Sequence, residues 1–272
     1  MPLVVSPKGR KYGHIPAKLS PQDKLYADSH AKLSAAALPA KVTNLPWMNT
    51  TIKNQGQLGA CTAFSGSEQR EYLSKRFVGT YTQLSPLFLY FVERTIDGDV
   101  SQDAGSTLRT TQSALHNVGI CPEADDPYVI ANFTKIPTQQ DYKDAAKYIT
   151  GSYHRLMNIS DMKNTLNDGF VFQLGFNVYS SFENDATGSI ATTGIMTMPN
   201  LNTEQLLGGH AVCVYGYDDT FAFPGTTMKG ALLIRNSWGA DWGAGGNFFM
   251  PYPYIDLYVS ECWMCHLGTS WH

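Results

Sequence analysis

The chain has 272 residues, of which 43% are hydrophobic and 16% are charged, and its formal net charge is −3. This composition is typical of a folded globular protein, and the length allows one large core or two smaller ones. The slight excess of acidic residues argues against a nucleic-acid partner. No apolar run approaches the roughly 20 residues of a membrane-spanning helix, so we expect no membrane partner either.

The first 38 residues form a polar extension that is too short to build its own core. The residues Ser6-Pro7-Lys8-Gly9 predict a hairpin turn, flanked by residues 3–5 and 10–12. A helix is expected over residues 20–37. The N-terminus lacks the apolar stretch of a signal peptide, so either the protein is intracellular or a signal has been removed.

A glycine-containing loop then leads into Cys61, where a helix is expected to begin and to continue to Gly79. A thiol in the first turn of a helix faces unpaired backbone N–H groups and the positive end of the helix dipole, which favour the thiolate. Gln55 offers an amide donor that a folded-back loop can bring to a developing oxyanion. Taken alone, Cys61 would more often be a buried core residue.

Two later stretches supply the partners that a cysteine nucleophile needs. Residues 208–217 predict a strand with His210 near its start, and residues 232–236 predict an apolar strand that ends at Asn236. A nucleophile needs a base, and the base needs a third group to hold its ring. Cys61, His210 and Asn236 can fill these roles in that order.

At these residues the chain resembles the papain family of cysteine peptidases, and in particular its bacterial branch. Two positions depart from the family pattern. Leu58 replaces a cysteine that usually forms a disulfide, and Thr62 replaces an aromatic residue, so the local wall of the cleft should differ. The matching stretches are residues 55–64, 84–86, 119–120, 126–128, 209–217 and 234–246, so the resemblance covers roughly residues 39–265.

The resemblance and the expected elements both imply an α+β, papain-like two-domain fold. A helical domain would pack against an antiparallel β-barrel-like domain, with the active site in the cleft between them. We expect an extension over residues 1–38, a mainly helical half over 39–128 and a mainly β half over 129–272, whose C-terminal tail returns to the helical half. Helices are expected after caps at Ser85 and Ser106, at about 139–149 and after a cap at Ser160, and strands at 170–178, 194–198, 210–217, 231–236 and 247–251.

The resemblance implies a cysteine endopeptidase that acts on peptide or protein substrates through a thioester, without a metal or other cofactor. Cys61, His210, Asn236 and Gln55 would be catalytic, and Trp238 would shield the His–Asn contact from water. The backbone of Gly105 would pair with the substrate, although a plain turn glycine is an equal alternative. Gly208 and Ala211 would line the main specificity pocket, where their small size favours an apolar side chain two positions before the scissile bond.

The resemblance also implies that residues 1–38 are an inhibitory prosegment, cut at about residues 35–40 on activation. The alternative is a frayed terminus or linker. We expect a monomer that is secreted or periplasmic, or alternatively cytoplasmic. Two other functions stay open: an acyl transferase or deamidase acting on protein amides, and a non-enzymatic scaffold.

The remaining cysteines allow several interpretations. Cys213 is expected to be a buried core thiol on the strand of His210. The run from Cys262 to Cys265 and His266 has the C-x-x-C-H form of haem attachment, but a single copy at a chain end argues against haem. A redox pair stays possible. In the family's layout the tail returns to the helical half, which implies a disulfide from Cys121 to Cys262 or Cys265.

Overall fold

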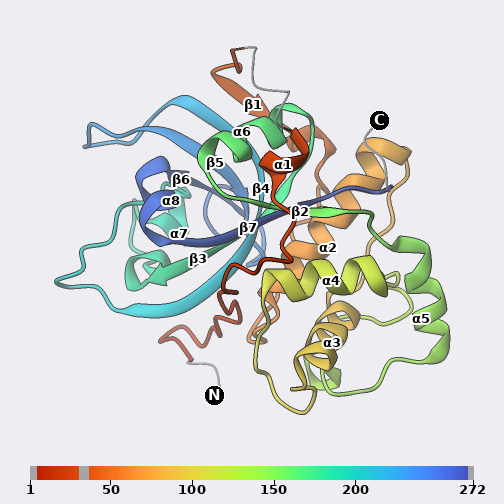
Figure 1. Cartoon of the computed structure of the whole chain (residues 1–272). Helices are drawn as coiled ribbons and strands as arrows, with labels where there is room; N and C mark the ends of the chain where they lie inside the picture. Colours follow the sequence, from red (N-terminus) through yellow and green to blue (C-terminus); the bar gives the residue numbers. More distant parts are fainter. Residues whose placement is uncertain (1–4, 31–36, 269–272) are drawn as a thin grey trace.

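The computed structural model describes residues 5–30 and 37–268 and shows a helical layer beside an antiparallel sheet (Figure 1). The sheet follows the order β2-β7-β3-β4-β5-β6, and β1 pairs with β4 outside this path. The α+β fold class is therefore confirmed, with an open sheet in place of a closed barrel. The strands are β1 (Lys41–Thr43), β2 (Tyr153–Leu156), β3 (Phe172–Tyr179), β4 (Leu206–Ala222), β5 (Lys229–Arg235), β6 (Asn247–Pro251) and β7 (Val259–Cys265).

Four helices begin after a residue whose side chain caps them, namely α3, α4, α5 and α6. Ser85 accepts a hydrogen bond from Phe88 N, as expected for a cap before Pro86. The caps of α4 and α6 are Thr107 and Asn158, so the expectations for Ser106 and Ser160 were wrong by one and two residues. The helices are α1 (Tyr26–His30), α2 (Cys61–Leu73), α3 (Pro86–Asp97), α4 (Leu108–Asn117), α5 (Gln139–Ala145), α6 (Ile159–Asn167), α7 (Ile190–Thr193) and α8 (Tyr252–Tyr258).

Helix α2 lies between the two layers, and all of its side chains are buried. On one side, Phe64 packs in the helical core with residues of α3 and α4. On the other, Tyr72 and Leu73 pack against Val171, next to β3, and Tyr215 of β4. Because both cores are built onto this helix, its first turn lies at the boundary between them. The division at residue 128 stays a prediction, and Ala145 of α5 packs in the helical core.

The strands differ from the expected set by one absence, at residues 194–198, and by three additions, β1, β2 and β7. Residues 194–198 form no named strand, because Gly194 has a φ of +72° and Ile195 makes only an isolated bridge to Phe249. Strand β7 was missed, since its sequence was interpreted in terms of cysteine chemistry. It pairs with both β2 and β3.

All five cysteines are free and buried, so the expected disulfide of Cys121 is not formed. Cys121 packs in the helical core, whereas Cys262 packs in the sheet core. Cys265 contributes to a third cluster with Tyr72 and Tyr215. The tail does reach the helical side, since Gly151 N donates to His266 O and Thr150 N donates to Leu115 O.

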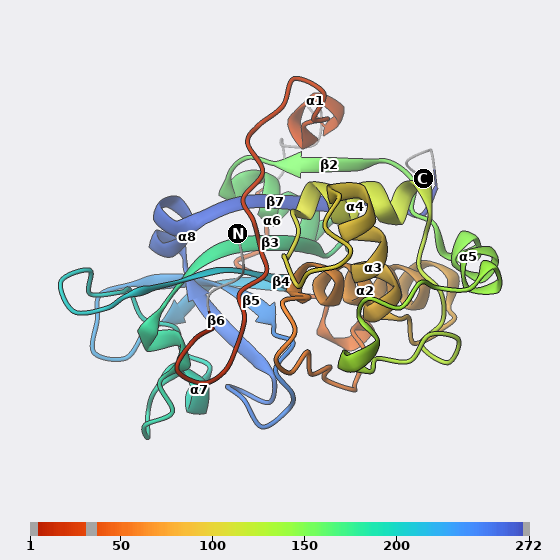
Figure 2. The same ribbon diagram turned by 90° about the horizontal axis from the view of Figure 1, so that it is seen from below.

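The N-terminal segment runs across the boundary between the sheet and the helices, where Figure 2 shows it as a dark red trace. Val5 pairs with Lys11, and Ser6 N donates to Arg10 O, so the expected hairpin is present over the described residues. Residues 1–4 lie outside the described part of the chain. The helix expected over 20–37 is seen only at Tyr26–His30, and residues 31–36 also lie outside the described residues.

Candidate active site

Cys61 is the first residue of α2, and its side chain is fully buried. The helix begins after Ala60, which provides no side-chain cap, so the first N–H groups of the helix are left for other acceptors. The backbone N–H groups of Ala211, Gly13 and Thr62 act to lower the pKa of the thiol, against the larger effect of burial. The thiol therefore lies where a developing negative charge would find several donors.

His210 and Asn236 come from the neighbouring strand β4 and from the end of β5. His210 Nε2 lies 2.8 Å from Asn236 Oδ1, which also accepts from Ser237 N at 2.8 Å. Because an amide oxygen can only accept, Nε2 carries the ring proton and Nδ1 carries the lone pair. Nδ1 has no hydrogen-bond partner among the described residues. His210 is therefore in the tautomer that can take a proton from a thiol.

Trp238 and Gln55 complete the surroundings of this pair. The indole of Trp238 stacks on the imidazole of His210, with ring centroids 5.0 Å apart. Gln55 is buried, its Oε1 accepts from Ser237 Oγ at 2.7 Å, and its Nε2 donates to Leu58 O at 3.0 Å. Its amide has a second proton besides the one used on Leu58. The loop thus holds a donor in a fixed orientation beside the start of α2.

The N-terminal segment covers Cys61 with main-chain contacts to both walls. His14 N donates to Gly209 O on the sheet side, and Ser106 N donates to Gly13 O on the helical side. Ile15 N then donates to Ser106 O. A Cβ added to Gly13 would lie 1.7 Å from Gly59 O, so the backbone passes too close to the loop for any side chain. The segment is seated as an added strand between the two walls.

Further along, the segment is anchored by charged groups. Asp23 forms a paired contact with Arg109, through Nε at 2.8 Å and Nη2 at 2.7 Å, and it also meets Arg155 at 3.2 Å. At the hairpin, Lys11 pairs with Asp103 at 2.7 Å. These contacts hold the segment at both ends of the cleft.

Burial sets the protonation of the catalytic pair. It raises the pKa of the Cys61 thiol to about 12, although the N–H groups of Ala211 and Gly13 oppose the change. Burial also lowers the pKa of His210 to about 4, although the hydrogen bond to Asn236 acts in the opposite direction. Burial by the segment therefore favours the neutral forms of both groups.

Of the positions expected to bind substrate, Gly105, Gly208 and Trp238 meet the segment. A Cβ on Gly105 would lie 2.2 Å from Gly13 O, and one on Gly208 would lie 2.7 Å from Tyr12 Cβ. Both glycines have positive φ angles, +75° and +146°. Ala211 packs with Cys61, Leu108 and Trp263 in one buried cluster.

Sequence reasoning missed one carboxylate in this region. Glu261 of β7 accepts from the backbone N–H groups of Ala17 and Leu108 and from Trp263 Nε1. Burial raises its pKa. His14 Nδ1 lies 3.9 Å from Glu261, and its Nε2 lies 2.8 Å from Ser260 Oγ. The only sequence signal for Glu261 would have been an acidic residue within an apolar strand, and the sequence did not predict that strand.

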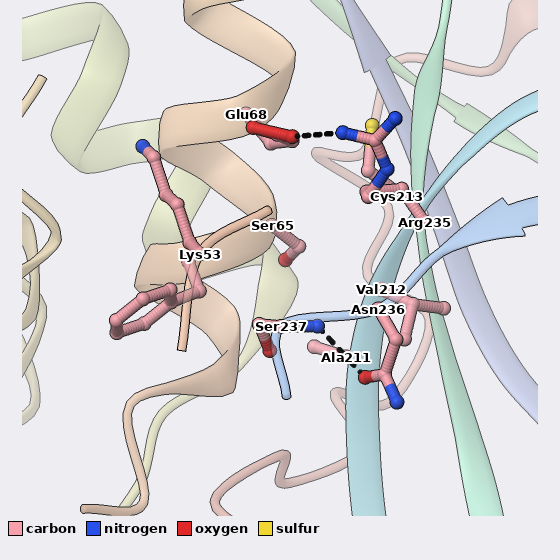
Figure 3. A pocket seen from close by; sticks show the side chains of 10 residues that line it. Lys53, Ser65, Glu68, Ala211, Val212, Cys213, Arg235, Asn236 and Ser237 are labelled. Carbon is pink, nitrogen blue, oxygen red and sulfur yellow. Dashed lines mark hydrogen bonds and ion pairs between the residues drawn. The ribbon is translucent and has the colours of Figure 1, made fainter. Parts of the chain in front are cut away.

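A small cavity of about 10 Å³ lies behind the catalytic pair, between α2 and the sheet. Figure 3 shows Arg235 of β5 reaching Glu68 of α2 across it, at 3.1 Å. The same view shows Asn236 held by Ser237 N. The cavity is no larger than one water molecule needs, so it cannot receive a peptide.

Over residues 5–30 and 37–268, no cluster of three or more His, Cys, Asp or Glu side chains is arranged to hold a metal ion. Within the same ranges, no helix is both long and apolar enough to cross a bilayer.

Comparison with known proteins assigns the chain to a family. The sequence profile of the papain family cysteine proteases matches residues 43–262. The chain belongs to the papain family of cysteine proteases. It is therefore a hydrolase with the papain-like fold, and Gln55, Cys61, His210 and Asn236 lie within the matched region.

Particular relatives agree with this assignment. The structure of xylellain, a cysteine protease from Xylella fastidiosa, superimposes with a TM-score of 0.83 at 31% identity, covering 95% of this chain and 97% of that one. A peptidase C1-like protein of Acanthamoeba polyphaga mimivirus, described as uncharacterized, is 28% identical over 96% of this chain and 88% of its own length. Oryzain gamma chain of Oryza sativa subsp. japonica is 26% identical, and the alignment spans 82% of this chain but 58% of that protein.

Proposed function

We propose that this papain-family protease is an endopeptidase present as a latent proenzyme. Cys61 is the nucleophile, His210 the base and Asn236 the group that orients the ring. The observation that carries the proposal is the seating of Gly13 and His14, where Ser106 N donates to Gly13 O at 2.8 Å and His14 N donates to Gly209 O at 3.0 Å. A substrate cannot enter while this main chain lies between Gly105 and Gly209.

The catalytic cycle follows from the residue types once the segment leaves. Water enters the cleft and lowers the cost of charge on the pair, so His210 Nδ1 takes the thiol proton and the thiolate attacks a peptide carbonyl. The Gln55 amide and the N–H of Cys61 stabilise the oxyanion. His210 then protonates the leaving amine, and water hydrolyses the thioester.

On the acyl side, the small residues Gly208 and Ala211 and the apolar neighbours Leu108 and Trp263 favour an apolar side chain two positions before the scissile bond. Glu261 is already engaged by the N–H groups of Leu108 and Trp263, which offset its charge. A fluorogenic peptide with leucine at that position should be cut faster than its arginine counterpart. Faster cleavage of the arginine peptide would refute this preference.

One assay separates the three functions. After removal of the segment, an epoxide probe should label the protein, and labelling should vanish in Cys61→Ala. Cleavage of internal peptide bonds then supports the endopeptidase. Transfer to amines or deamidation without cleavage would favour the acyl transferase or deamidase, and absence of labelling would favour the scaffold.

A further inference from the structure

Glu183, at the end of the short helical turn η5 (Ser180–Glu183), is a buried carboxylate whose partners all come from the N-terminal segment. Its Oε1 accepts from Ser6 Oγ and from Tyr12 OH, each at 2.6 Å. Arg10 Nε lies 4.0 Å away. Among the described residues, no hydrogen bond or ion pair joins the Glu183 carboxylate to the body of the enzyme. Removal of the segment therefore leaves a carboxylate without its donors.

The neighbourhood of Glu183 is suited to a cation. The guanidinium of Arg10 lies over the indole of Trp238, 3.9 Å from the ring centroid. Lys8 forms an ion pair with Asp185. A hollow of about 320 Å³ adjoins these groups. Among the described residues that line it, the basic ones are Lys8 and Arg10, and both belong to the segment. The body of the enzyme contributes Glu183, Asp185, Ala191, Thr192, Trp238, Asp241 and Trp242.

The position of Trp238 fixes which part of a substrate would meet this surface. Trp238 stacks on His210, and His210 must protonate the leaving amine. The residues that follow the scissile bond therefore lie on the Trp238 side of the histidine. Carboxylates and an indole face are the groups that hold a guanidinium or an ammonium.

We propose that Glu183, Asp185, Asp241 and Trp238 form a leaving-side subsite that selects arginine or lysine in the first two residues after the scissile bond. The segment's Arg10 and Lys8 occupy this subsite in the latent form, and a basic substrate restores the contacts that Glu183 loses on activation. This inference rests on the proposed endopeptidase function.

The test uses the full chain, folded intact, then nicked at a site-specific protease sequence inserted between His30 and Pro39 and separated from the cut segment by gel filtration. The substrates are internally quenched peptides that have the same sequence before the scissile bond. They carry arginine, alanine or glutamate at the two positions after it. The arginine peptide should exceed the glutamate peptide in kcat/KM by about tenfold or more, as expected for a charged hydrogen bond with a cation–π contact. Glu183→Gln should reduce this ratio to within about twofold, while Asp256→Asn, an equal loss of charge on α8, should leave it unchanged.

A second readout measures the same subsite through the acyl-enzyme. Argininamide and glycinamide compete with water for the thioester, and the preference for argininamide should be lost in Glu183→Gln. Equal cleavage of the three peptides, or an arginine preference that survives Glu183→Gln, would overturn the subsite and leave the endopeptidase intact. Absence of both cleavage and Cys61 labelling in the nicked protein would overturn the proposed function and the subsite with it.

Discussion

The reactivity of Cys61 depends on a few polar contacts that the fold holds in place. Asn236 Oδ1 fixes the proton on His210 Nε2, and Ser237 ties Asn236 and Gln55 into one loop-to-strand network. The oxyanion donor and the base are therefore positioned by adjacent residues, 236 and 237. A change in either should alter the chemical step more than substrate binding.

The first prediction concerns Gln55. Gln55→Ala removes the side-chain donor to the oxyanion, so kcat of the activated enzyme should fall by about 10²–10³-fold with a much smaller change in KM. Ser237→Ala is the matched control, because it removes the hydroxyl that Gln55 Oε1 accepts from and leaves the donor in place. Equal losses in the two variants would show that Gln55 acts only through its packing.

The second prediction concerns His14 and pH. Burial lowers the pKa of His14 from the usual 6.5 to about 3, and the nearby His210 lowers it further by a smaller amount. The His14 ring faces Ser260 and Glu261 of β7. Between pH 6.5 and about 3, the His14 ring is therefore neutral when the segment lies in the cleft (docked) and protonated when the segment has left it (released). Docking is strongest above pH 6.5 and should weaken by up to about tenfold per pH unit below it.

The measurement is the ratio of full-length to segment-free activity at each pH, which cancels the pH dependence of catalysis itself. The ratio should rise as the pH falls from 7 to 5. In His14→Gln, which cannot become charged, the rise should be shallower. An identical rise in both proteins would contradict a role for His14.

At the scale of elements, the N-terminal segment behaves as an extra strand whose fit depends on the absence of side chains. Gly13, Gly105 and Gly209 meet at one point, where each added Cβ would overlap a backbone atom of another part of the chain. Main-chain hydrogen bonds on both sides hold the segment, and its charged anchors lie at the ends of the cleft.

The third prediction follows from this close approach. Gly13→Ala places a methyl group 1.7 Å from Gly59 O, which cannot be accommodated without moving backbone. The full-length variant should therefore be active against peptides without any cleavage of the chain. Lys18→Ala, an exposed side chain of the same segment, should stay latent. A latent Gly13→Ala protein would show that the segment tolerates displacement at this point.

The sequence predicted most of the elements that position the site. The glycine loop before Cys61, the cap at Ser85 and the apolar strands of His210 and Asn236 are local signals, and the structure has elements at each of them. It did not predict β7, Glu261 or the acidic surface around Glu183. Their role depends on pairing between residues far apart in the chain, such as Gly175 with Glu261, which local patterns do not encode.

At the scale of the whole molecule, the two layers are joined by buried ion pairs on α2. Glu68 pairs with Arg235 of β5 at 3.1 Å, and Glu71 pairs with Lys53 at 2.6 Å. Arg235 also donates to Asn49 O at 2.9 Å and to Asn247 Oδ1 at 2.9 Å. These contacts fix the helix that carries Cys61 against the strands that carry His210 and Asn236.

The fourth prediction concerns this connection. Glu68→Ala leaves Arg235 buried without its counter-charge, so the free energy of unfolding should fall by about 3–5 kcal/mol. Chemical denaturation followed by circular dichroism measures the loss. The double variant Glu68→Leu/Arg235→Met removes both charges and should be more stable than Glu68→Ala. A double variant no better than the single one would contradict a penalty from the unpaired charge.

The occlusion of Cys61 by residues 5–17 is the central claim, and the rate of covalent labelling of Cys61 tests it most directly. An epoxide probe is added to the full-length protein, to protein lacking residues 1–38, and to the shortened protein mixed with a peptide of residues 5–25. Labelling should be at least about 100-fold faster without the segment, because only the open fraction of the full-length protein reacts, and the added peptide should slow it again. Equal labelling rates in the full-length and shortened proteins would contradict the account.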